Sequence, residues 1–299
     1  MSVAARQRPP AGTILLDHVS HFVPDLRAAA LLLEALGFTV TLPSAQQTQD
    51  GPAGTSNVCV MLEDGYLEFL APTADTPNAQ RLRAAMQRYP GVHLACFGTP
   101  AADEEHARLG WHGFEPQPLV HLARPVEIHG KARTARFKVV RPALEKMPEG
   151  RIQFVEHLTP DALWQSRYLE HSNSITRLAC VFVVAEDAVQ AAARWARFAA
   201  LLPRRAGNFV HMETARGHVL IGARKDWNAI LGEVPPAPAL AGYALECRDP
   251  KAIVSRCERL GMKPRQLRDN LYTVTLPGAL GSAWVFGTRD ALGFPTRKT

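Results

Sequence analysis

Near the start of the chain, apolar residues recur at helical spacing. Leu26, Ala30, Leu33 and Leu36 fall on one face of a helix, with Gly37 directly after them. Glycine often ends a helix because it takes a left-handed conformation at little cost. Apolar, strand-like segments lie on both sides of this stripe. The pattern therefore predicts a strand, a helix and then further strands.

The same order of elements recurs along the chain as four β-α-β-β-β units. The strands expected after each helix cover residues 38–42, 56–62 and 66–70 in the first unit, 117–121, 134–140 and 152–156 in the second, 208–213 and 218–222 in the third, and 263–267, 271–276 and 282–286 in the fourth. One unit leaves a face of its sheet exposed, so the units are expected to associate in pairs. The predicted fold class is α+β, with four βαβββ modules paired into two domains.

Domain boundaries follow from this repeat. We expect a disordered tail over 1–12, an N-terminal domain of modules one and two over 13–160, and a crossover over 161–174. A C-terminal domain of modules three and four is expected over 175–290, followed by a second tail over 291–299. His171 and Asn173 are expected to brace the crossover.

Modules one and two carry a repeated pair of chemically active residues. His18 and Glu68 recur as His93 and Glu156 in matching local sequence. Two imidazoles and two carboxylates, with two waters, would give an octahedral site for one divalent metal ion: Ni, Co, Mn, Fe(II), Mg or Zn. Strand alternation places Gln153 on the face opposite Glu156, but a β-bulge would exchange the two.

Composition narrows the class of protein. The chain has 299 residues, of which 46 % are hydrophobic and 21 % charged, as in an ordinary globular protein. No apolar stretch approaches the roughly 18 residues that span a membrane. The net charge is +6, but the arginines are spread out and no nucleic-acid motif is present. We therefore expect a small-molecule substrate, which the positive charge allows to be anionic, and neither nucleic acid nor a membrane as a partner.

The cysteines indicate a reducing compartment. Five are scattered along the chain without a CxxC motif, and several lie in apolar runs. Residues 1–12 also lack the apolar core of a secretory signal. The expected localisation is cytoplasmic.

Several motifs together resemble the vicinal-oxygen-chelate (VOC) superfamily and, more narrowly, bacterial glyoxalase-like domain proteins. The residues that carry the resemblance are Leu16-Asp17-His18-Val19, Val23-Pro24-Asp25-Leu26, Leu36-Gly37-Phe38-Thr39-Val40, Gly54-Thr55 with Asn57, Tyr66-Leu67-Glu68-Phe69-Leu70-Ala71-Pro72, and His171 with Asn173. The resemblance implies two glyoxalase/bleomycin-resistance/dioxygenase-like domains. It also implies that two curled sheets face each other around a cavity that holds a metal ion, with His18, Glu68, His93 and Glu156 as ligands.

The activity that the resemblance implies is that of a metal-dependent glyoxalase-like enzyme of the isomerase or lyase type. The ion would polarise vicinal oxygens of the substrate, and Glu156 or Glu68 would act as general base. Two alternatives remain open: an extradiol-type dioxygenase, and a non-catalytic VOC protein that sequesters a ligand. Family members often pair, so a homodimer is compatible with the resemblance.

Three further residues are candidates for substrate binding. Arg133 and Arg136 could hold a carboxylate, although their alternation also suits the solvent-exposed face of a strand. Asn57 could bind a ligand or simply belong to a turn. In the C-terminal half, Arg177 and Tyr243 replace the repeated histidine, so no metal is expected there.

Overall fold

Four successive β-α-β-β-β units build the protein, as the sequence pattern predicts. The computed structural model describes residues 2–294. The first two units comprise β1 (Leu15–Phe22), α1 (Leu26–Ala35), β2 (Ser44–Thr48), β3 (Gly51–Met61), β4 (Tyr66–Pro72), β5 (Gly91–Gly98), α3 (Ala102–Trp111), β6 (Val120–Ile128), β7 (Lys131–Val140) and β8 (Arg151–His157). The last two comprise β9 (Ile175–Val184), α4 (Ala188–Ala199), β10 (Pro203–Ala206), β11 (Phe209–Glu213), β12 (His218–Gly222), β13 (Ala239–Cys247), α6 (Pro250–Arg259), β14 (Arg265–Arg268), β15 (Leu271–Thr275) and β16 (Ala283–Gly287). The helices α2 (Pro77–Arg88) and α5 (Arg224–Leu231) link the units within each pair, and α7 (Arg289–Leu292) follows β16.

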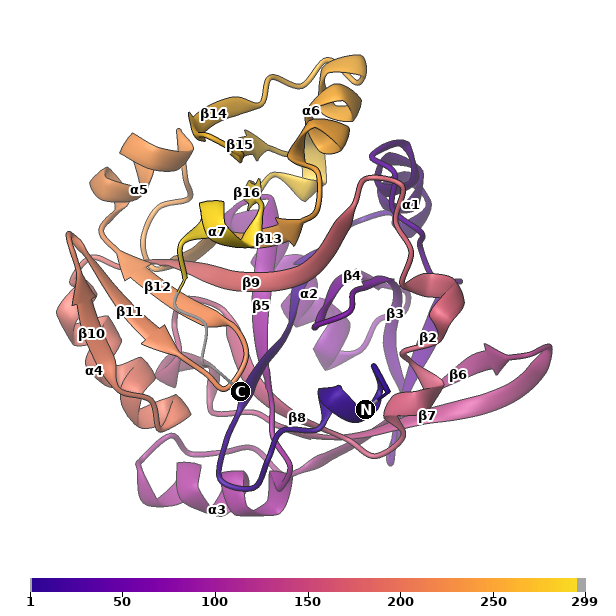
Figure 1. Ribbon diagram of the computed structural model, residues 1–299. Coiled ribbons are helices and arrows are strands. Elements are labelled where there is room, and N and C mark those ends of the chain that lie inside the picture. The colour runs from indigo at the N-terminus through magenta and orange to yellow at the C-terminus, as the bar shows by residue number, and fades with distance from the viewer. Residues whose placement is uncertain (1, 295–299) are drawn as a thin grey trace.

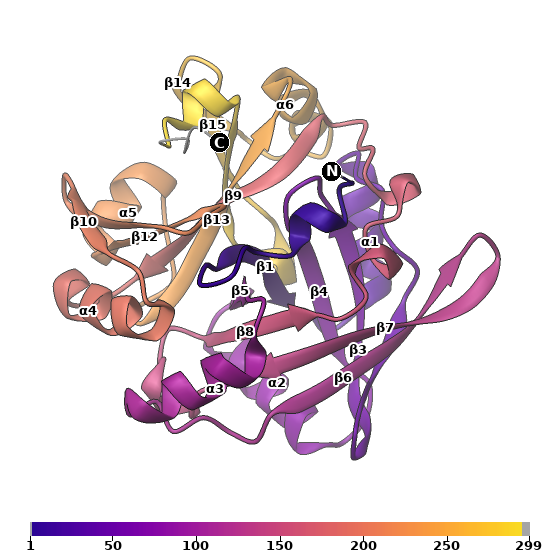
Figure 2. The same cartoon turned by 60° about the horizontal axis from the view of Figure 1, so that its bottom comes forward.

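The two pairs of units close differently. The first pair forms a closed barrel in the order β1-β4-β3-β2-β6-β7-β8-β5, whereas the second forms an open sheet in the order β10-β11-β12-β9-β13-β16-β15-β14. In Figure 1 the barrel runs from indigo to pink and the open sheet from pink to yellow. Figure 2 looks along the barrel wall and shows the β6–β7 hairpin extending away from the body. Only the N-terminal half therefore encloses an interior of its own.

A shared hydrophobic core joins the two halves. Side chains on the outer surface of the barrel, such as Val19 and Phe97, belong to the same buried cluster as Val181 and Trp284 of the open sheet. His21 also points outward, and its Nε2 lies 2.9 Å from the hydroxyl oxygen of Tyr243. The opposite face of the open sheet is filled by side chains of α5 and α7. The C-terminal half thus packs against the outer surface of the barrel.

The local signals around α1 act as expected. The side chain of Asp25 caps the helix by accepting hydrogen bonds from the backbone N–H groups of Arg27 and Ala28, at 2.7 and 3.2 Å. Gly37 ends the helix with φ +88°. In the crossover, His171 Nε2 lies 2.8 Å from the Met61 carbonyl oxygen, and Asn173 donates to the Leu36 carbonyl at 3.0 Å. Both residues therefore brace the crossover against module one.

Other expected elements need correction. Residues 38–42 form no strand, and β2 begins only at Ser44, after Pro43, which has no N–H for a ladder. The first 12 residues are not a disordered tail where they are described, because Gln7 is buried and donates to the Glu63 carbonyl at 2.9 Å. The expected tail over 291–299 overlaps α7, and residues 295–299 lie outside the described residues.

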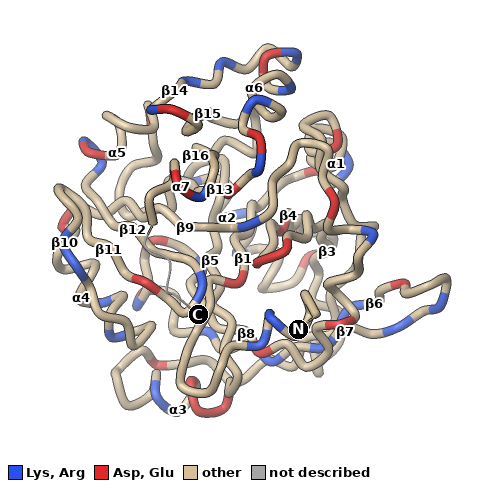
Figure 3. The backbone as a smooth tube through the Cα atoms, in the orientation of Figure 1, with Lys and Arg blue, Asp and Glu red and all other residues tan. Residues whose placement is uncertain are grey.

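The surface carries mixed charge. Figure 3 shows basic and acidic segments interspersed over the whole trace, without a single basic face. Each of the five cysteines is free and buried. Among the described helices, none has the length and apolar character needed to cross a membrane.

Candidate active site in the N-terminal barrel

A polar cavity of about 40 Å³ lies inside the barrel. Alternate residues of a strand face the interior, so each strand contributes side chains at a spacing of two. The polar lining residues are His18, Gln46, Asn57, Tyr66, Glu68, Arg124, Arg141, Arg151 and Gln153. Of the residues expected at the site, His18, Glu68 and Asn57 are therefore brought together.

Glu68 is the carboxylate of this cavity, and it is held by three donors. The Ser20 hydroxyl donates to Oε2 at 2.8 Å, while the side-chain amides of Asn57 and Gln46 donate to Oε1 at 2.6 and 3.3 Å. Only 5 % of Glu68 is exposed. The three hydrogen bonds fix the carboxylate in one orientation, with Oε2 3.8 Å from His18 Nε2.

His18 is oriented by the residue beside it in the chain. Its Nδ1 lies 2.7 Å from Asp17 Oδ2, which leaves Nε2 directed toward Glu68. The imidazole also stacks on Tyr66, with ring centroids 4.3 Å apart. Burial opposes charge on His18, but Cys96 and Asp17 outweigh it through charge and hydrogen bonds and raise the pKa of His18 well above its usual range. The hydrogen bond with Asp17 thus favours the protonated form of the imidazole.

Asp17 reaches two imidazoles because β1 is irregular at this point. The pairing of β1 with β5 shifts between Leu16 and His18, as in a β-bulge. Asp17 Oδ1 lies 2.9 Å from His157 Nε2, while Oδ2 binds His18. Burial works against ionisation, but the charges and hydrogen bonds of His157 and His18 prevail and hold the pKa of Asp17 well below its usual range.

His93 and Glu156 do not join this site. His93 lines a different cavity, where burial lowers its pKa to about 4, so the neutral ring donates from Nε2 to the Tyr89 carbonyl at 2.8 Å. Glu156 Oε2 accepts a hydrogen bond at 3.0 Å from the backbone N–H of Ala102, at the start of α3. The expected convergence of four ligands is therefore not what the structure contains.

The register of the strands explains this difference. In module one, β1 and β4 align His18 with Tyr66 and Ser20 with Glu68. In module two, β5 and β8 align Leu94 with Arg151 and Cys96 with Gln153. The structural counterparts of His18 and Glu68 are thus Leu94 and Gln153. The local sequence match selects His93, one residue before Leu94 on β5, and Glu156, three residues after Gln153 on β8. Because a displacement by an odd number of residues turns a side chain to the opposite face of the sheet, His93 and Glu156 point away from the cavity.

The expected substrate-binding residues also separate. Asn57 lines the cavity, but its amide is already bound to Glu68. Arg133 and Arg136 are exposed on β7 and do not line the cavity. The buried residues of β7 are Ala135, Phe137, Val139 and Val140. Arg136 points to the face opposite Ala135 and Phe137, whereas Arg133 shares their face but lies in the exposed hairpin end over residues 131–134.

The donor atoms present fit the expected metal ion poorly. The cavity offers one imidazole, one carboxylate and the neutral amide of Gln153. Asp17, His18 and Cys96 also place one potential ligand atom each within 4.8 Å of one another. However, Asp17 is shared between two imidazoles, and burial raises the pKa of the Cys96 thiol. Divalent ions are held by several imidazole or anionic donors, and this cavity supplies only one of each.

A double substitution tests the register assignment. Leu94→His with Gln153→Glu would place a second imidazole and a second carboxylate in the cavity, because both parent side chains line it. We expect Mn²⁺ or Ni²⁺ to bind this variant roughly tenfold or more tightly than the parent in a calorimetric titration.

Two single variants control this experiment. His93→Ala and Glu156→Ala should leave the ion affinity of the parent unchanged, because neither side chain reaches the cavity. If His93→Ala lowered the ion affinity of the parent protein, the register assignment would be wrong.

Sequence reasoning missed several residues of the site. Asp17 bonds His18, while Gln46 and Arg124 line the cavity. Arg141 and Arg151 lie at its border and also line a neighbouring cavity. A signal existed for Arg151, which is two positions before Gln153 and therefore shares its face. Nothing in the local sequence marks Arg124 or Arg141.

Comparison with known structures gives the same fold at low sequence identity. A hypothetical protein from Staphylococcus aureus matches with a TM-score of 0.65 and 10% identity, covering 92% of this chain and 99% of its own. A catechol 2,3-dioxygenase matches with a TM-score of 0.54 and 12% identity, covering 93% and 88%. The Mn(II)-bound glyoxalase from Novosphingobium aromaticivorans matches with a TM-score of 0.55 and 9% identity, covering 92% and 82%. No curated protein matches the sequence.

The sequence itself carries a family signature over more than half of its length. The family model described as a glyoxalase-like domain matches residues 16–199, which include β1, β4 and the cavity between them. Together with the four β-α-β-β-β units and the barrel, this match establishes that the chain belongs to the glyoxalase-like domain family of the VOC superfamily.

Proposed function

We propose that the protein is an enzyme that transfers a proton on a small oxygenated substrate, with Glu68 as general base and His18 as its partner. The observation that carries the proposal is the geometry of Glu68. It is a buried carboxylate with three fixed donors, and one of its oxygens lies 3.8 Å from Nε2 of the His18 imidazole. A base held in this way is preorganised for proton abstraction.

The proposed step uses only side chains of this chain. Glu68 Oε2 takes a proton from a carbon next to a substrate carbonyl, and the electron pair of the broken C–H bond moves onto the carbonyl oxygen. The developing negative charge is stabilised by the N–H of His18, which Asp17 keeps in position. In an α-hydroxy carbonyl substrate, the hydroxyl proton then moves to the oxygen that gained the charge, and Glu68 returns its proton to the former carbonyl carbon, which gives an isomer. In a substrate with a leaving group on the β-carbon, that group departs with its bonding electron pair as the Cα–Cβ double bond forms and the carbonyl is restored, which gives a lyase product.

Two other functions weigh less. An extradiol dioxygenase needs two imidazoles and one carboxylate on iron. Among the described residues that line the barrel cavity, His18 supplies the only imidazole. Ligand sequestration is the second candidate, and the observation that favours it is a partly apolar cavity next to the barrel.

Proton exchange with solvent tests the proposal without a known substrate. A panel of 2-oxo acids and α-hydroxy aldehydes is incubated with the protein in D₂O, and loss of the α-proton signal is followed by NMR. We expect faster exchange than in buffer for at least one compound, and no effect of EDTA. Binding of a compound without any exchange would support sequestration instead, and activity that EDTA removes and Mn²⁺ restores would contradict chemistry without a metal.

A further inference from the structure

A second cavity of about 220 Å³ opens beside the barrel. It lies between α2, the start of β8 and the loop over residues 141–150. Arg141 and Arg151 line both this cavity and the polar interior that contains Glu68. The two spaces therefore meet at these two side chains.

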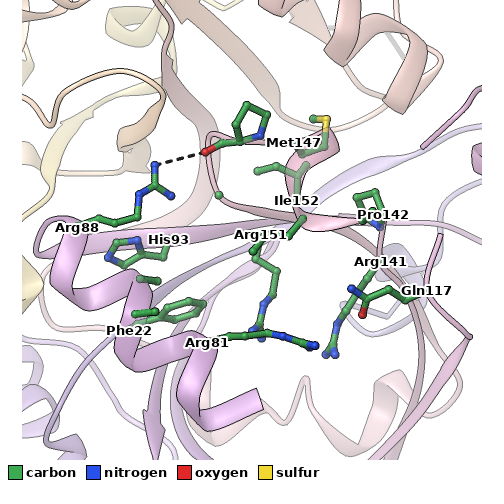
Figure 4. A pocket seen from close by; sticks show the side chains of 16 residues that line it. Phe22, Arg81, Arg88, His93, Gln117, Arg141, Pro142, Met147, Arg151 and Ile152 are labelled. Carbon is green, nitrogen blue, oxygen red and sulfur yellow. Dashed lines mark hydrogen bonds between the residues drawn. The ribbon is translucent and has the colours of Figure 1, made fainter. Parts of the chain in front are cut away.

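Positive charge is concentrated where they meet. Figure 4 shows the guanidinium groups of Arg81, Arg141 and Arg151 pointing toward one another. Within residues 2–294, no carboxylate oxygen lies within 4.0 Å of any of the three, and the cavity lining contains no Asp or Glu. Among the residues that the structure describes, the one side-chain hydrogen bond of these three arginines joins Arg141 Nε to the Gln153 amide oxygen at 3.2 Å. The three guanidinium groups thus form no ion pair among the described residues, and the carboxylate that acts on Arg141 and Arg151 from the barrel interior, Glu68, only partly offsets their charge.

Burial and the mutual repulsion of these charges contribute to lowered pKa values of Arg141 and Arg151, the two arginines that border the barrel interior. Burial, together with the charges of Arg141 and Arg81, lowers the pKa of Arg151 to about 9. Burial and the charge of Arg81 likewise lower the pKa of Arg141. Both guanidinium groups remain cationic at neutral pH, so a bound anion would relieve their repulsion.

Most of the remaining wall of the cavity is apolar. Phe22, Ala85, Met147 and Ile152 contribute to its wall, as Figure 4 shows for those that it labels. A fourth arginine, Arg88, donates to the carbonyl oxygens of Pro148 and Pro238 at 3.4 and 2.7 Å and so is already occupied. A ligand that satisfies both parts needs a charged head and an apolar body.

We infer that this cavity binds a small organic anion, with its carboxylate or phosphate on Arg81, Arg141 and Arg151 and its apolar body against Met147 and Ile152. The volume is below the range usual for drug-sized ligands, which favours a small molecule. Because the charged end lies at the border of the barrel interior, the bound anion is the substrate of the reaction proposed for Glu68. That last role rests on the proposed function, whereas the binding site itself does not.

Four probes test the ligand class by NMR titration: benzoate, phenyl phosphate, neutral benzamide and inorganic phosphate. We expect at least one organic anion to bind roughly tenfold or more tightly than benzamide, because only the anion satisfies the three guanidinium groups. Inorganic phosphate should bind more weakly than phenyl phosphate, because it leaves the apolar wall unused. The preferred anion shows whether the head is a carboxylate or a phosphate. Equal affinity for benzoate, phenyl phosphate and benzamide would overturn the inference, as would inorganic phosphate binding as well as phenyl phosphate.

A matched pair of variants on one helix locates the site. Arg81→Ala removes a guanidinium that lines the cavity, whereas Arg83→Ala, two residues further along α2, removes one paired with Asp75 at 3.6 Å. Both change the net charge equally. We expect only Arg81→Ala to lower the affinity for the preferred anion, by roughly tenfold, with Arg151→Gln as a second variant. Equal losses in the two α2 variants would indicate a general charge effect and contradict a site.

The catalytic and binding proposals can fail separately. Binding of an organic anion without any proton exchange would contradict the role of Glu68 as general base but would still support the anion-binding site. Proton exchange without preferential binding of an anion over benzamide would contradict the anion-binding site but would still support the role of Glu68 as general base.

Discussion

Glu68→Gln is expected to slow substrate proton exchange by roughly 10²–10⁴-fold, the usual contribution of a general base. The amide cannot accept the substrate proton, although it keeps the size of the side chain. The measurement is the initial exchange rate by NMR, with folding checked by circular dichroism. The rate constant should fall without a loss of affinity for an organic anion, because Arg81, Arg141 and Arg151 are unchanged.

Glu156→Gln is the matched control for this experiment. Both glutamates are equivalent in the local sequence pattern, but Glu156 faces away from the cavity and binds the backbone N–H of Ala102. Its exchange rate should equal that of the parent, since a glutamine oxygen still accepts that hydrogen bond. If Glu156→Gln were the inactive variant, the geometric assignment of the base would have to be abandoned.

Asp17→Asn is expected to destabilise the protein by about 3–5 kcal/mol, the typical cost of breaking a buried charge pair. Asp17 is fully buried and binds His18 and His157 at 2.7 and 2.9 Å. An asparagine offers only one accepting oxygen, and it removes the charged carboxylate that contacts His18 Nδ1 and His157 Nε2. The free energy of unfolding in urea at pH 7 is the measurement.

The exposed Asp103 provides the control for that substitution. It binds Lys138 at 2.5 Å on the surface, so Asp103→Asn should change stability little. A similar loss of stability in both variants would show that the buried contacts of Asp17 with His18 and His157 contribute no more than a surface ion pair.

The pH dependence of stability gives a second readout for Asp17. Its pKa is depressed in the folded protein, so its contribution is present above the unfolded value near 3.8 and lost as pH falls. The pKa of His18 is raised, so its contribution is full below 6.5 and lost as pH rises through the folded value. In the Asp17→Asn variant, the free energy of unfolding should therefore depend less on pH, both at acidic pH and at pH above 6.5.

Much of the fold is readable from the sequence because it is encoded locally. Asp25 and Gly37 mark the two ends of α1 directly. The linking helix α2 went unpredicted although Thr76 caps it and Pro77 occupies its first turn. Only Ala79 and Leu82 of this helix are buried, so the apolar stripe that signals a helix is weak.

The site is less readable because strand register is a tertiary property. His18 and Glu68 could be selected by alternation within β1 and β4. His93 and Glu156 matched them in local sequence, but the pairing of β5 with β8 places Leu94 and Gln153 at the equivalent positions. The convergence of Arg81, Arg141 and Arg151 depends on three separate elements, and no local pattern records it.

The matched stretch of the family, residues 16–199, runs past the barrel and ends with α4. That helix carries Trp195 and Phe198. The Phe198 ring stacks on Phe154 with centroids 4.7 Å apart, and the Trp195 ring lies 6.2 Å from that of Phe97. The matched stretch therefore includes, besides the barrel strands, the aromatic side chains that join the barrel to the C-terminal half. A substitution that shortens Trp195 or Phe198 would leave a void at this junction and weaken the contact between the two halves.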